Sequence, residues 1–279
     1  MKSENIEFLK QDYIKSNFFQ KKFGKDLKLV ETSGINELTK IFLKKVKDDL
    51  NIDCDISQIG NLHNKVENKL KEYDQNYGLS EMTKVFAEMP KNFNKQCVLI
   101  LKETIREEIG EDFFFQIQPT LRIQMPHHSS NSFYPVYHSD IQNGHPPYMI
   151  NIWLPLNPPS ELEGHGFNIA PLDESIKIFK EYNYDIYQIQ NEHKKFKYLD
   201  NYSETQKFEF GKSIMFDPRK MHSTMPLKDH VRVSVDMRIV PVELFKKFNR
   251  KYKSIFGRRE SVFEPGGYYQ ADSIDNYKI

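Results

Sequence analysis

The chain has 279 residues, with 40 Lys and Arg against 39 Asp and Glu, and its formal net charge is +1. That length can bury a full core, and the balanced charge supplies no field that would recruit nucleic acid or a membrane surface. The two cysteines, Cys54 and Cys97, are too few for a disulfide framework, and no signal segment or bilayer-spanning apolar run is visible, so we expect a cytoplasmic protein.

Residues 1–110 are predicted to form a helical N-terminal region. Leu38, Ile41 and Phe42 recur at the spacing of one helical face. The ranges 61–73 and 81–109 show a similar pattern, and Pro90 interrupts the second of them.

The amino-acid composition changes in residues 111–242, where β-forming residues and prolines become frequent. Strands are expected near 113–125, 134–138, 147–156, 166–170, 206–216 and 230–242. Residues 173–202 are expected to be a helix and a charged loop inserted into this region. The predicted fold class is α+β, with a double-stranded β-helix (a jelly-roll or cupin-like core) on which the N-terminal helical region packs.

Residues 243–279 are predicted to form a C-terminal helix and tail. A basic helix is expected over 242–256, and its charge is interpreted as a solvated face. The segment Gly266-Gly267-Tyr268-Tyr269 is interpreted as a stretch that folds back as a lid or that mediates self-association, for example in a homodimer.

Three predicted strands place polar side chains on one face. Arg232, Ser234, Asp236 and Arg238 alternate with apolar residues, so they share a face of their strand. By the same period, Arg122 shares a face with Gln124, and Asn151 shares a face with Trp153. A solvated sheet face would explain the charged residues but explains Trp153 poorly. A barrel with a polar ligand cavity explains all three strands.

His138 and Asp140 form a His-x-Asp pair that carries little weight alone. Such a pair should occur by chance roughly once in a chain with 9 His and 39 acidic residues among 279. His222 supplies a second imidazole after the turn signal Asp217-Pro218. Two imidazoles and one carboxylate form a facial triad, which favours non-haem Fe(II). Arg232 could hold the carboxylate of an organic co-substrate, with Ser234 as a second donor.

This combination resembles the iron- and 2-oxoglutarate-dependent dioxygenases, and most of all their phytanoyl-CoA hydroxylase-like branch. The run Trp153-Leu154-Pro155-Leu156 is similar to a strand of that branch, and the run from Gly166 to Pro171 is similar to another but lacks its final Gly-Ser-His. The region from Arg122 to Pro171 also resembles StrG-type proteins of aminoglycoside clusters.

The resemblance implies roles for individual residues. His138, Asp140 and His222 would bind Fe(II), and the acid at position 140 implies hydroxylation or a related oxidation rather than halogenation. Arg232 and Ser234 would bind 2-oxoglutarate, and O2 would complete the reaction. Gln124 and Asn151 are further candidates for co-substrate binding. Arg122, Trp153 and Arg238 are candidates for contact with the substrate, and for Arg238 a structural ion pair is an equal alternative.

The predicted function is therefore an Fe(II)- and 2-oxoglutarate-dependent oxygenase that oxidises a small polar metabolite, derived from a sugar, an aminocyclitol or an amino acid, and releases succinate and CO2. Two alternatives remain open. One is a metal-dependent isomerase or epimerase of the cupin type, which leaves Arg232 and Ser234 unexplained. The other is a non-catalytic binding module.

Overall fold

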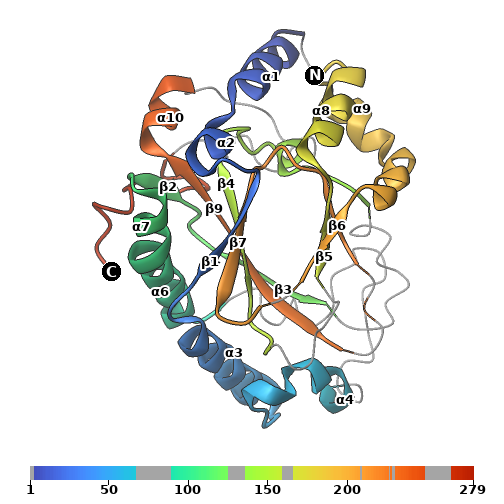
Figure 1. Ribbon diagram of the computed structural model, residues 1–279. Coiled ribbons are helices and arrows are strands. Elements are labelled where there is room, and N and C mark those ends of the chain that lie inside the picture. Colours follow the sequence, from blue (N-terminus) through green and yellow to red (C-terminus); the bar gives the residue numbers. More distant parts are fainter. Residues whose placement is uncertain are drawn as a thin grey trace.

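The computed structural model describes residues 3–66, 89–124, 136–158, 166–207, 209–225, 227, 230–248 and 265–279. In this part of the chain the protein is α+β, with two antiparallel sheets and helices packed outside them (Figure 1). The helices of the first 66 residues lie at both ends of the sheets, the first two at the top of the view and the later ones at the lower left and bottom (Figure 1).

The larger sheet has six strands, all paired antiparallel. Its order is β1-β7-β4-β9-β2, and β3 also pairs with β9. The ten-residue β9 therefore carries β4 on one edge and both β2 and β3 on the other. The strands are β1 (Leu27–Glu31), β2 (Phe113–Phe115), β3 (Thr120–Gln124), β4 (Ile150–Pro155), β7 (Lys212–Phe216) and β9 (Arg232–Pro241).

The smaller sheet has the order β6-β5-β8 and faces the larger one. Its strands are β5 (Phe167–Ile169), β6 (Glu204–Gln206) and β8 (His222–Thr224). An isolated antiparallel bridge adds His138 to the free edge of β8. The two sheets meet through Phe167, whose ring lies 5.0 Å from Trp153 of β4 and 5.7 Å from Phe216 of β7.

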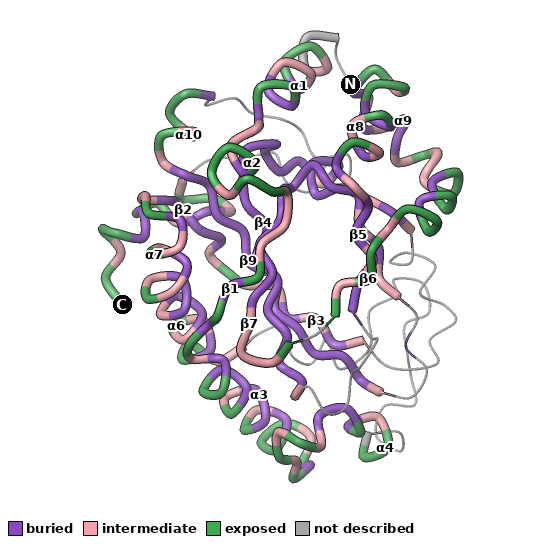
Figure 2. The backbone as a smooth tube through the Cα atoms, in the orientation of Figure 1, coloured by how far each residue is buried: buried purple, intermediate pink, exposed green. Residues whose placement is uncertain are grey.

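The predicted alternation on β9 and β4 is confirmed, and its polar face turns into the space between the sheets. Val233, Val235 and Met237 of β9 join Ile150 and Ile152 of β4 in the main hydrophobic core. Figure 2 shows both strands largely buried: all of β4 is buried, and in β9 only Asp236 is of intermediate burial. A solvated polar face is therefore excluded for these strands.

Helices cover the outer face of the larger sheet, and their apolar residues complete the same core. Leu38 and Phe42 of α3 and Phe93 of α6 belong to it. These helical elements are α3 (Ile35–Leu50), η1 (Ile56–Asn61), α4 (Leu62–Val66), α6 (Lys91–Ile100), the π-helical turn η2 (Leu101–Ile105) and α7 (Arg106–Ile109). Of the ranges expected to be helical, 67–73, 81–88 and 249–256 lie outside the described residues.

A second hydrophobic cluster gathers helices from both ends of the chain at the end of the sheets. Tyr13 stacks on Phe179 with ring centroids 4.4 Å apart, and Phe248 and Tyr269 belong to the same cluster. The elements of this cluster are α1 (Ser3–Lys15), η3 (Asp140–Asn143), α8 (Leu172–Glu181), α9 (Ile186–Asn191), η5 (His193–Asn201) and α10 (Val242–Phe248). The short helix α2 (Phe18–Phe23) packs on the main core instead, through Phe19. The inserted segment is thus helical along most of its length, with less loop than expected.

The expectation of a purely helical N-terminal region was wrong at one place. Residues 27–31 form β1, which pairs with β7 over five residues and provides an edge strand of the larger sheet. The strand is only partly buried, with Val30 buried and Leu29 42% exposed. Its alternation of apolar and polar residues is therefore weak, and the neighbouring segments are helical. The N-terminal region therefore shares the sheet instead of only packing on it.

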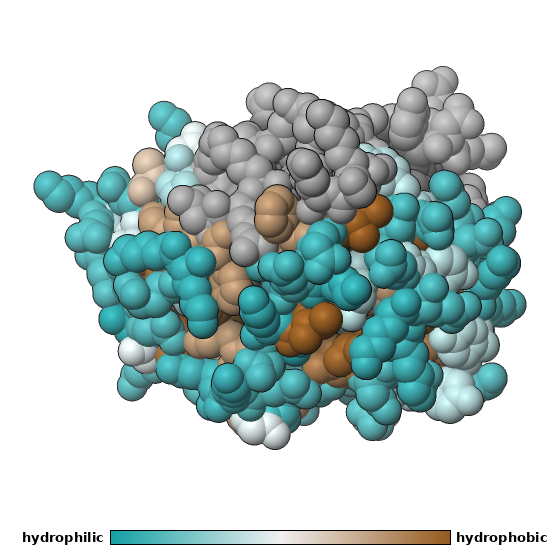
Figure 3. Space-filling model, turned by 90° about the horizontal axis from the view of Figure 1, so that it is seen from above, coloured by the Kyte–Doolittle hydropathy of each residue, from teal (hydrophilic) through white to brown (hydrophobic). Residues whose placement is uncertain are grey.

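Two observations concern the surface. Among the described residues, no helix combines the length and the apolar character needed to cross a bilayer. The face shown in Figure 3 is mainly hydrophilic where it is described, with groups of hydrophobic residues between hydrophilic ones. Phe8 and Ile14 of α1 are among the exposed hydrophobic residues of the described chain.

Gly166 offers a test of how tightly the smaller sheet is built. A Cβ atom at this position would lie 1.3 Å from the carbonyl oxygen of Gln206 on the neighbouring strand. Replacement of Gly166 by alanine should therefore displace β6 and cost about 1–3 kcal/mol. The melting temperature should fall by several degrees, and an unchanged value in a thermal melt would contradict this packing.

Candidate metal centre

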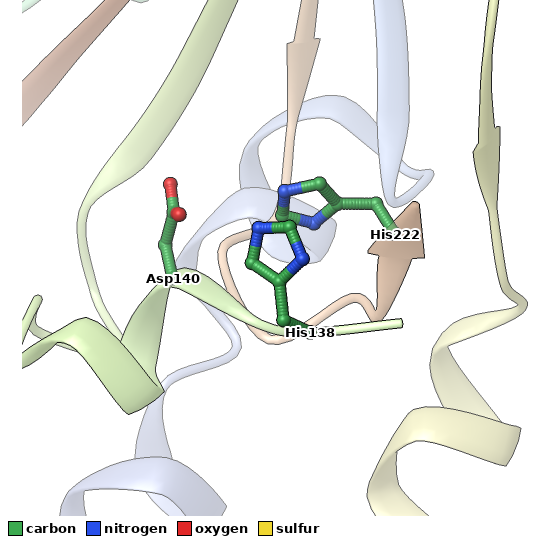
Figure 4. A group of neighbouring side chains, drawn as sticks. All are labelled: His138, Asp140 and His222. Carbon is green, nitrogen blue, oxygen red and sulfur yellow. The ribbon is translucent and has the colours of Figure 1, made fainter. Parts of the chain in front are cut away.

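His138, Asp140 and His222 gather at one point between the sheets. Each residue offers one ligand atom, and the three atoms lie within 4.8 Å of one another. Figure 4 shows the two imidazole rings side by side with the Asp140 carboxylate next to them. Since imidazole nitrogens bind metals at about 2.1 Å, an ion would draw the three groups somewhat closer together. The three residues singled out in the sequence therefore lie together in the structure and form a ligand set that could hold a metal ion.

The backbone brings the two histidines together. The amide of each donates to the carbonyl of the other, His138 to His222 at 3.0 Å and His222 to His138 at 2.9 Å. Because residues that exchange both bonds lie directly opposite each other, their side chains project on the same side. The ring centroids are 4.4 Å apart.

A helix cap places Asp140 beside the pair. Ser139 is the N-cap of η3 and forms a capping box with Gln142. The Ser139 hydroxyl also donates to the carbonyl of Pro218 at 2.8 Å, in the turn that leads to His222. This bond ties the segment that carries His138 and Asp140 to the segment that carries His222.

Backbone carbonyls orient both imidazoles. Nδ1 of His138 lies 3.2 Å from the carbonyl oxygen of Val136, and Nδ1 of His222 lies 3.2 Å from that of Lys220. Since a carbonyl oxygen can only accept, Nδ1 carries the proton in each ring. Each Nε2 therefore keeps its lone pair for a metal, an arrangement that is usual around metal-binding histidines.

The electrostatics keep all three groups in the form that a metal needs. Burial and the neighbouring His222 lower the pKa of His138 to about 3, and burial also lowers the pKa of His222. Burial alone would raise the pKa of Asp140, but Arg238, His222 and His145 outweigh it and hold this pKa well below its usual range. Both imidazoles are thus neutral and the carboxylate is ionised at neutral pH.

Metal binding should therefore depend less on pH in the mildly acidic range than it would with two ordinary imidazoles. A site loses affinity when protons compete for its ligands, and two imidazoles of ordinary pKa 6.5 would cost more than about tenfold between pH 7.5 and pH 6.0. Here the pKa of His138 lies near 3, so that ring stays unprotonated over the range, and the pKa of His222 is also lowered. The Co(II) dissociation constant should therefore rise clearly less than about tenfold over that range. A tenfold weakening in a spectroscopic titration would contradict the assignment.

Arg238 contacts the carboxylate of Asp140. Its Nε donates to Oδ2 at 3.0 Å, and both side chains are buried. Nη1 of Arg238 also donates to Oε1 of Gln116 at 3.3 Å and to the hydroxyl of Tyr268 at 3.2 Å. Of the two expectations for this residue, the structure shows the ion pair, and contact with a substrate stays a prediction.

Arg232 and Ser234 lie on the same face of β9 and carry unused polar atoms. Arg232 is 4% exposed and donates from Nη1 to the carbonyl of Gly166 at 2.7 Å. Among the described residues, its Nε has no hydrogen-bond partner, and neither does the hydroxyl of the fully buried Ser234. Burial lowers the pKa of Arg232 to about 10, although Asp236 acts in the opposite direction. Buried donors without partners are costly, and an anion in this place would satisfy them.

Asn151 and Gln124 have different surroundings. Asn151 is opposite Arg238 in the register of β4 and β9, it is 3% exposed, and its Nδ2 has no partner among the described residues. Gln124 donates from Nε2 to the carbonyl of Met225 at 2.7 Å, which connects the end of β3 to the segment after β8. The amide nitrogen of Asn151 is therefore a donor without a partner among the described residues, whereas the amide nitrogen of Gln124 already donates a hydrogen bond.

Arg122 and Trp153 line the pocket beside the cluster. Arg122 forms an ion pair with Asp236. Trp153 packs against Phe167, and Phe216 lies next to His222 with ring centroids 5.3 Å apart. The pocket contains the three cluster residues together with Arg122, Asn151, Trp153, Phe167, Phe216, Arg232, Asp236 and Arg238.

Four contributors were missed in the sequence. Phe167 and Phe216 form part of the aromatic wall, and Gln116 and Tyr268 hold Arg238. The two phenylalanines alternate with non-lining neighbours on β5 and β7, which is a signal that could have found them. Gln116 and Tyr268 have no comparable signal, because only the folded chain brings them to Arg238.

The chain matches no protein-family model and no curated protein sequence. It is similar in structure to the non-heme alpha ketoglutarate dependent carbocyclase SnoK from nogalamycin biosynthesis, with 9% identity, 81% of this chain and 83% of that chain covered, and a TM-score of 0.48.

It is also similar to EctD from S. alaskensis with 2-oxoglutarate and 5-hydroxyectoine, with 15% identity, 82% and 77% of the two chains covered, and a TM-score of 0.43. A third similar structure is an N-substituted L-amino acid dioxygenase from Burkholderia ambifaria, with 12% identity, 86% and 88% covered, and a TM-score of 0.35. Because these TM-scores lie below 0.5, the geometry of the site, and not this likeness, supports the function proposed below.

Proposed function

We propose that this protein is an Fe(II)- and 2-oxoglutarate-dependent oxygenase of the phytanoyl-CoA hydroxylase-like branch. The observation that carries the proposal is a pairing of two features. The His138, Asp140 and His222 cluster opens into the same pocket that Arg232 lines, and both Arg232 and Ser234 keep buried donors without partners among the described residues.

The strand order supports a double-stranded β-helix. In the larger sheet, β3 and the last strand of the core, β9, are neighbours, followed by β4 and β7. In the smaller sheet, the bridge at His138 is followed by β8, β5 and β6. Two facing antiparallel sheets with such interleaved connections are typical of a jelly roll.

The side chains of the pocket suit both Fe(II) and 2-oxoglutarate. His138, Asp140 and His222 would hold Fe(II) on one side and leave the opposite positions open. Arg232, with its planar fork, would bind one carboxylate of 2-oxoglutarate, and Ser234 would donate to the same group. The amide of Asn151 is a further donor for the co-substrate. The iron and its co-substrate, when bound, supply the activation of O2.

The protein's own residues hold these groups in place and limit access by water. Arg238 fixes the carboxylate of Asp140, and the carbonyls of Val136 and Lys220 fix the two imidazoles. Trp153, Phe167 and Phe216 give the pocket an aromatic wall. Exclusion of water strengthens the electrostatic interactions inside such a site.

The substrate proposed for this pocket is a small polar metabolite that undergoes hydroxylation or a related oxidation. Arg122 and Asp236 form an ion pair at the pocket surface, and such a pair offers both signs of charge to a polar molecule. Trp153 would pack against its carbon skeleton. A sugar, an aminocyclitol or an amino-acid derivative has this combination of features.

Turnover of 2-oxoglutarate tests the proposal against the two alternatives. The Fe(II)-loaded protein should convert 2-oxoglutarate to succinate in air, slowly alone and faster with a substrate, and should stop without O2. A metal-dependent isomerase would act on its substrate without O2 or 2-oxoglutarate. A binding module would form no succinate under any condition, and that result would refute the oxygenase.

A further inference from the structure

A buried arginine holds the carboxylate of Asp140 in place. Arg238 reaches it from β9, and the two side chains are 7% and 5% exposed. The bond from Nε uses one carboxylate oxygen, Oδ2. Because an ionised group in this environment must be paired, the direction of the Asp140 side chain depends on where the guanidinium lies.

Arg238 is in turn held by two other segments of the chain. Its Nη1 donates to Gln116, which directly follows β2, and to the hydroxyl of Tyr268 in the C-terminal segment. The ring of Tyr268 also lies edge-on to the ring of His145, with centroids 5.1 Å apart. Tyr268 therefore contacts both His145, two positions after η3, and Arg238, which orients Asp140.

Residues 265–279 are firmly attached to the sheet. The amide of Ile117 donates to the carbonyl of Tyr268 at 3.0 Å, and the amides of Gln270 and Ile274 donate to the carbonyls of Phe115 and Phe113 at 2.8 and 2.9 Å. An ion pair between Arg106 and Asp275, with bonds of 2.8 and 2.9 Å, fixes the far end. These bonds hold the position of Tyr268 along β2.

We propose that the C-terminal segment, residues 265–279, is a structural part of the metal centre, because Tyr268 acts through Arg238 to position Asp140 as a metal ligand. This inference rests on the proposed function for the identity of the metal site. Tyr268 is a positioning residue: it contacts the guanidinium and not the ligand atoms. Loss of such outer partners typically weakens metal binding 10- to 100-fold.

The alternative is that the segment only covers the core and stabilises the fold. Tyr269 allows the two roles to be separated. It is adjacent in sequence and 2% exposed, and its hydroxyl lies 3.6 Å from Sδ of Met149, without a described bond to Arg238. Replacement of either tyrosine by phenylalanine removes one hydroxyl from the same segment, so Tyr269→Phe is a matched control.

The experiment measures Co(II) affinity, the Co(II) d–d absorption spectrum and the melting temperature of the full-length protein. Tyr268→Phe should weaken Co(II) binding about 5- to 10-fold, at the lower end of outer-partner effects, and should shift the d–d bands. Tyr269→Phe should leave both unchanged. The melting temperature of Tyr268→Phe should be no lower than that of Tyr269→Phe.

A second variant tests the route through Arg238. Lysine keeps the positive charge but lacks the planar fork that reaches Asp140, Gln116 and Tyr268 together, so Arg238→Lys should weaken Co(II) binding about 10- to 100-fold. In the double variant Arg238→Lys with Tyr268→Phe, no further loss is expected, because the tyrosine acts only through the arginine.

Three results would overturn the inference: wild-type affinity in Tyr268→Phe, an equal loss in Tyr269→Phe, or additive losses in the double variant. If the wild type binds metal and 2-oxoglutarate while Tyr268→Phe behaves normally, only the role of the tail is refuted. If the wild type binds no metal, the proposed function is refuted together with the inference.

Discussion

Replacement of His222 by alanine should abolish metal binding. The variant keeps one imidazole and one carboxylate, so one of the three protein ligands is lost and the site should hold Fe(II) far more weakly. We expect the Fe(II) dissociation constant to rise by at least about 100-fold, and 2-oxoglutarate turnover to fall to the background rate. Anaerobic equilibrium dialysis followed by iron analysis measures the first effect, and succinate formation measures the second.

The control for this variant is His193→Gln. His193 begins η5 and its Nδ1 contacts the carbonyl of Gln190, so it belongs to the inserted helical segment and not to the pocket. Its replacement should leave iron binding unchanged. Wild-type iron affinity in His222→Ala would show that the metal, if any, binds elsewhere.

Replacement of Arg232 by alanine should remove 2-oxoglutarate binding and spare the metal. A buried, charge-assisted interaction of this kind contributes about 1.5–3 kcal/mol per bond, which corresponds to an increase of about 10- to 100-fold or more in the apparent dissociation constant of 2-oxoglutarate. The affinity for Fe(II) should stay within about twofold of the wild type, because Arg232 does not contact the three ligands. Titration of 2-oxoglutarate into the Fe(II)-loaded variant measures the first quantity, and anaerobic equilibrium dialysis against Fe(II) measures the second.

Arg232→Lys refines this test. The lysine keeps the charge but loses the fork, so its 2-oxoglutarate affinity should fall between that of the wild type and that of the alanine variant. If both variants lose the metal, Arg232 is structural, and its bond to the carbonyl of Gly166 would be its main role. Unchanged affinity for 2-oxoglutarate in both would refute the carboxylate anchor.

The sequence predicted the parts of the site that follow from strand periodicity. Arg232, Ser234 and Arg238 share a face of β9 because successive side chains alternate, and the structure places this face between the sheets. The same rule placed Trp153 and Asn151 inside. For these residues the two-residue period of a strand was enough to predict which side chains share a face, since that period does not depend on which strands are neighbours.

Contacts between distant segments could not be predicted in this way. The sequence did not decide whether Arg238 contacts the substrate or forms a structural ion pair. Its partner Asp140 lies 98 positions away, and no sequence pattern indicates that the two residues meet. Tyr268 belongs to a segment without strand or helix periodicity, and its role depends on backbone bonds to residues near β2. The edge strand β1 was missed because five half-covered residues between helices give a weak signal.

The local structure around Asp140 also differs from the expected strand. The range 134–138 was expected to be a strand; among its described residues only His138 takes part in a bridge, and residues 134 and 135 lie outside the described part of the chain. Ser139 then caps η3, so a turn, and not a continuing strand, directs Asp140 toward the histidines. Ser139 and Gln142 are three positions apart, which is the spacing of a capping box, and this signal was available in the sequence.

The central claim, that one site holds iron and 2-oxoglutarate together, is tested most directly by anaerobic absorption spectroscopy. Addition of 2-oxoglutarate to the Fe(II)-loaded wild-type protein should produce the weak visible charge-transfer band of the chelate, which saturates at one co-substrate per chain. The band should be missing in His222→Ala and should require far more 2-oxoglutarate in Arg232→Ala. Absence of the band in the wild type, or its full retention in His222→Ala, would contradict the account.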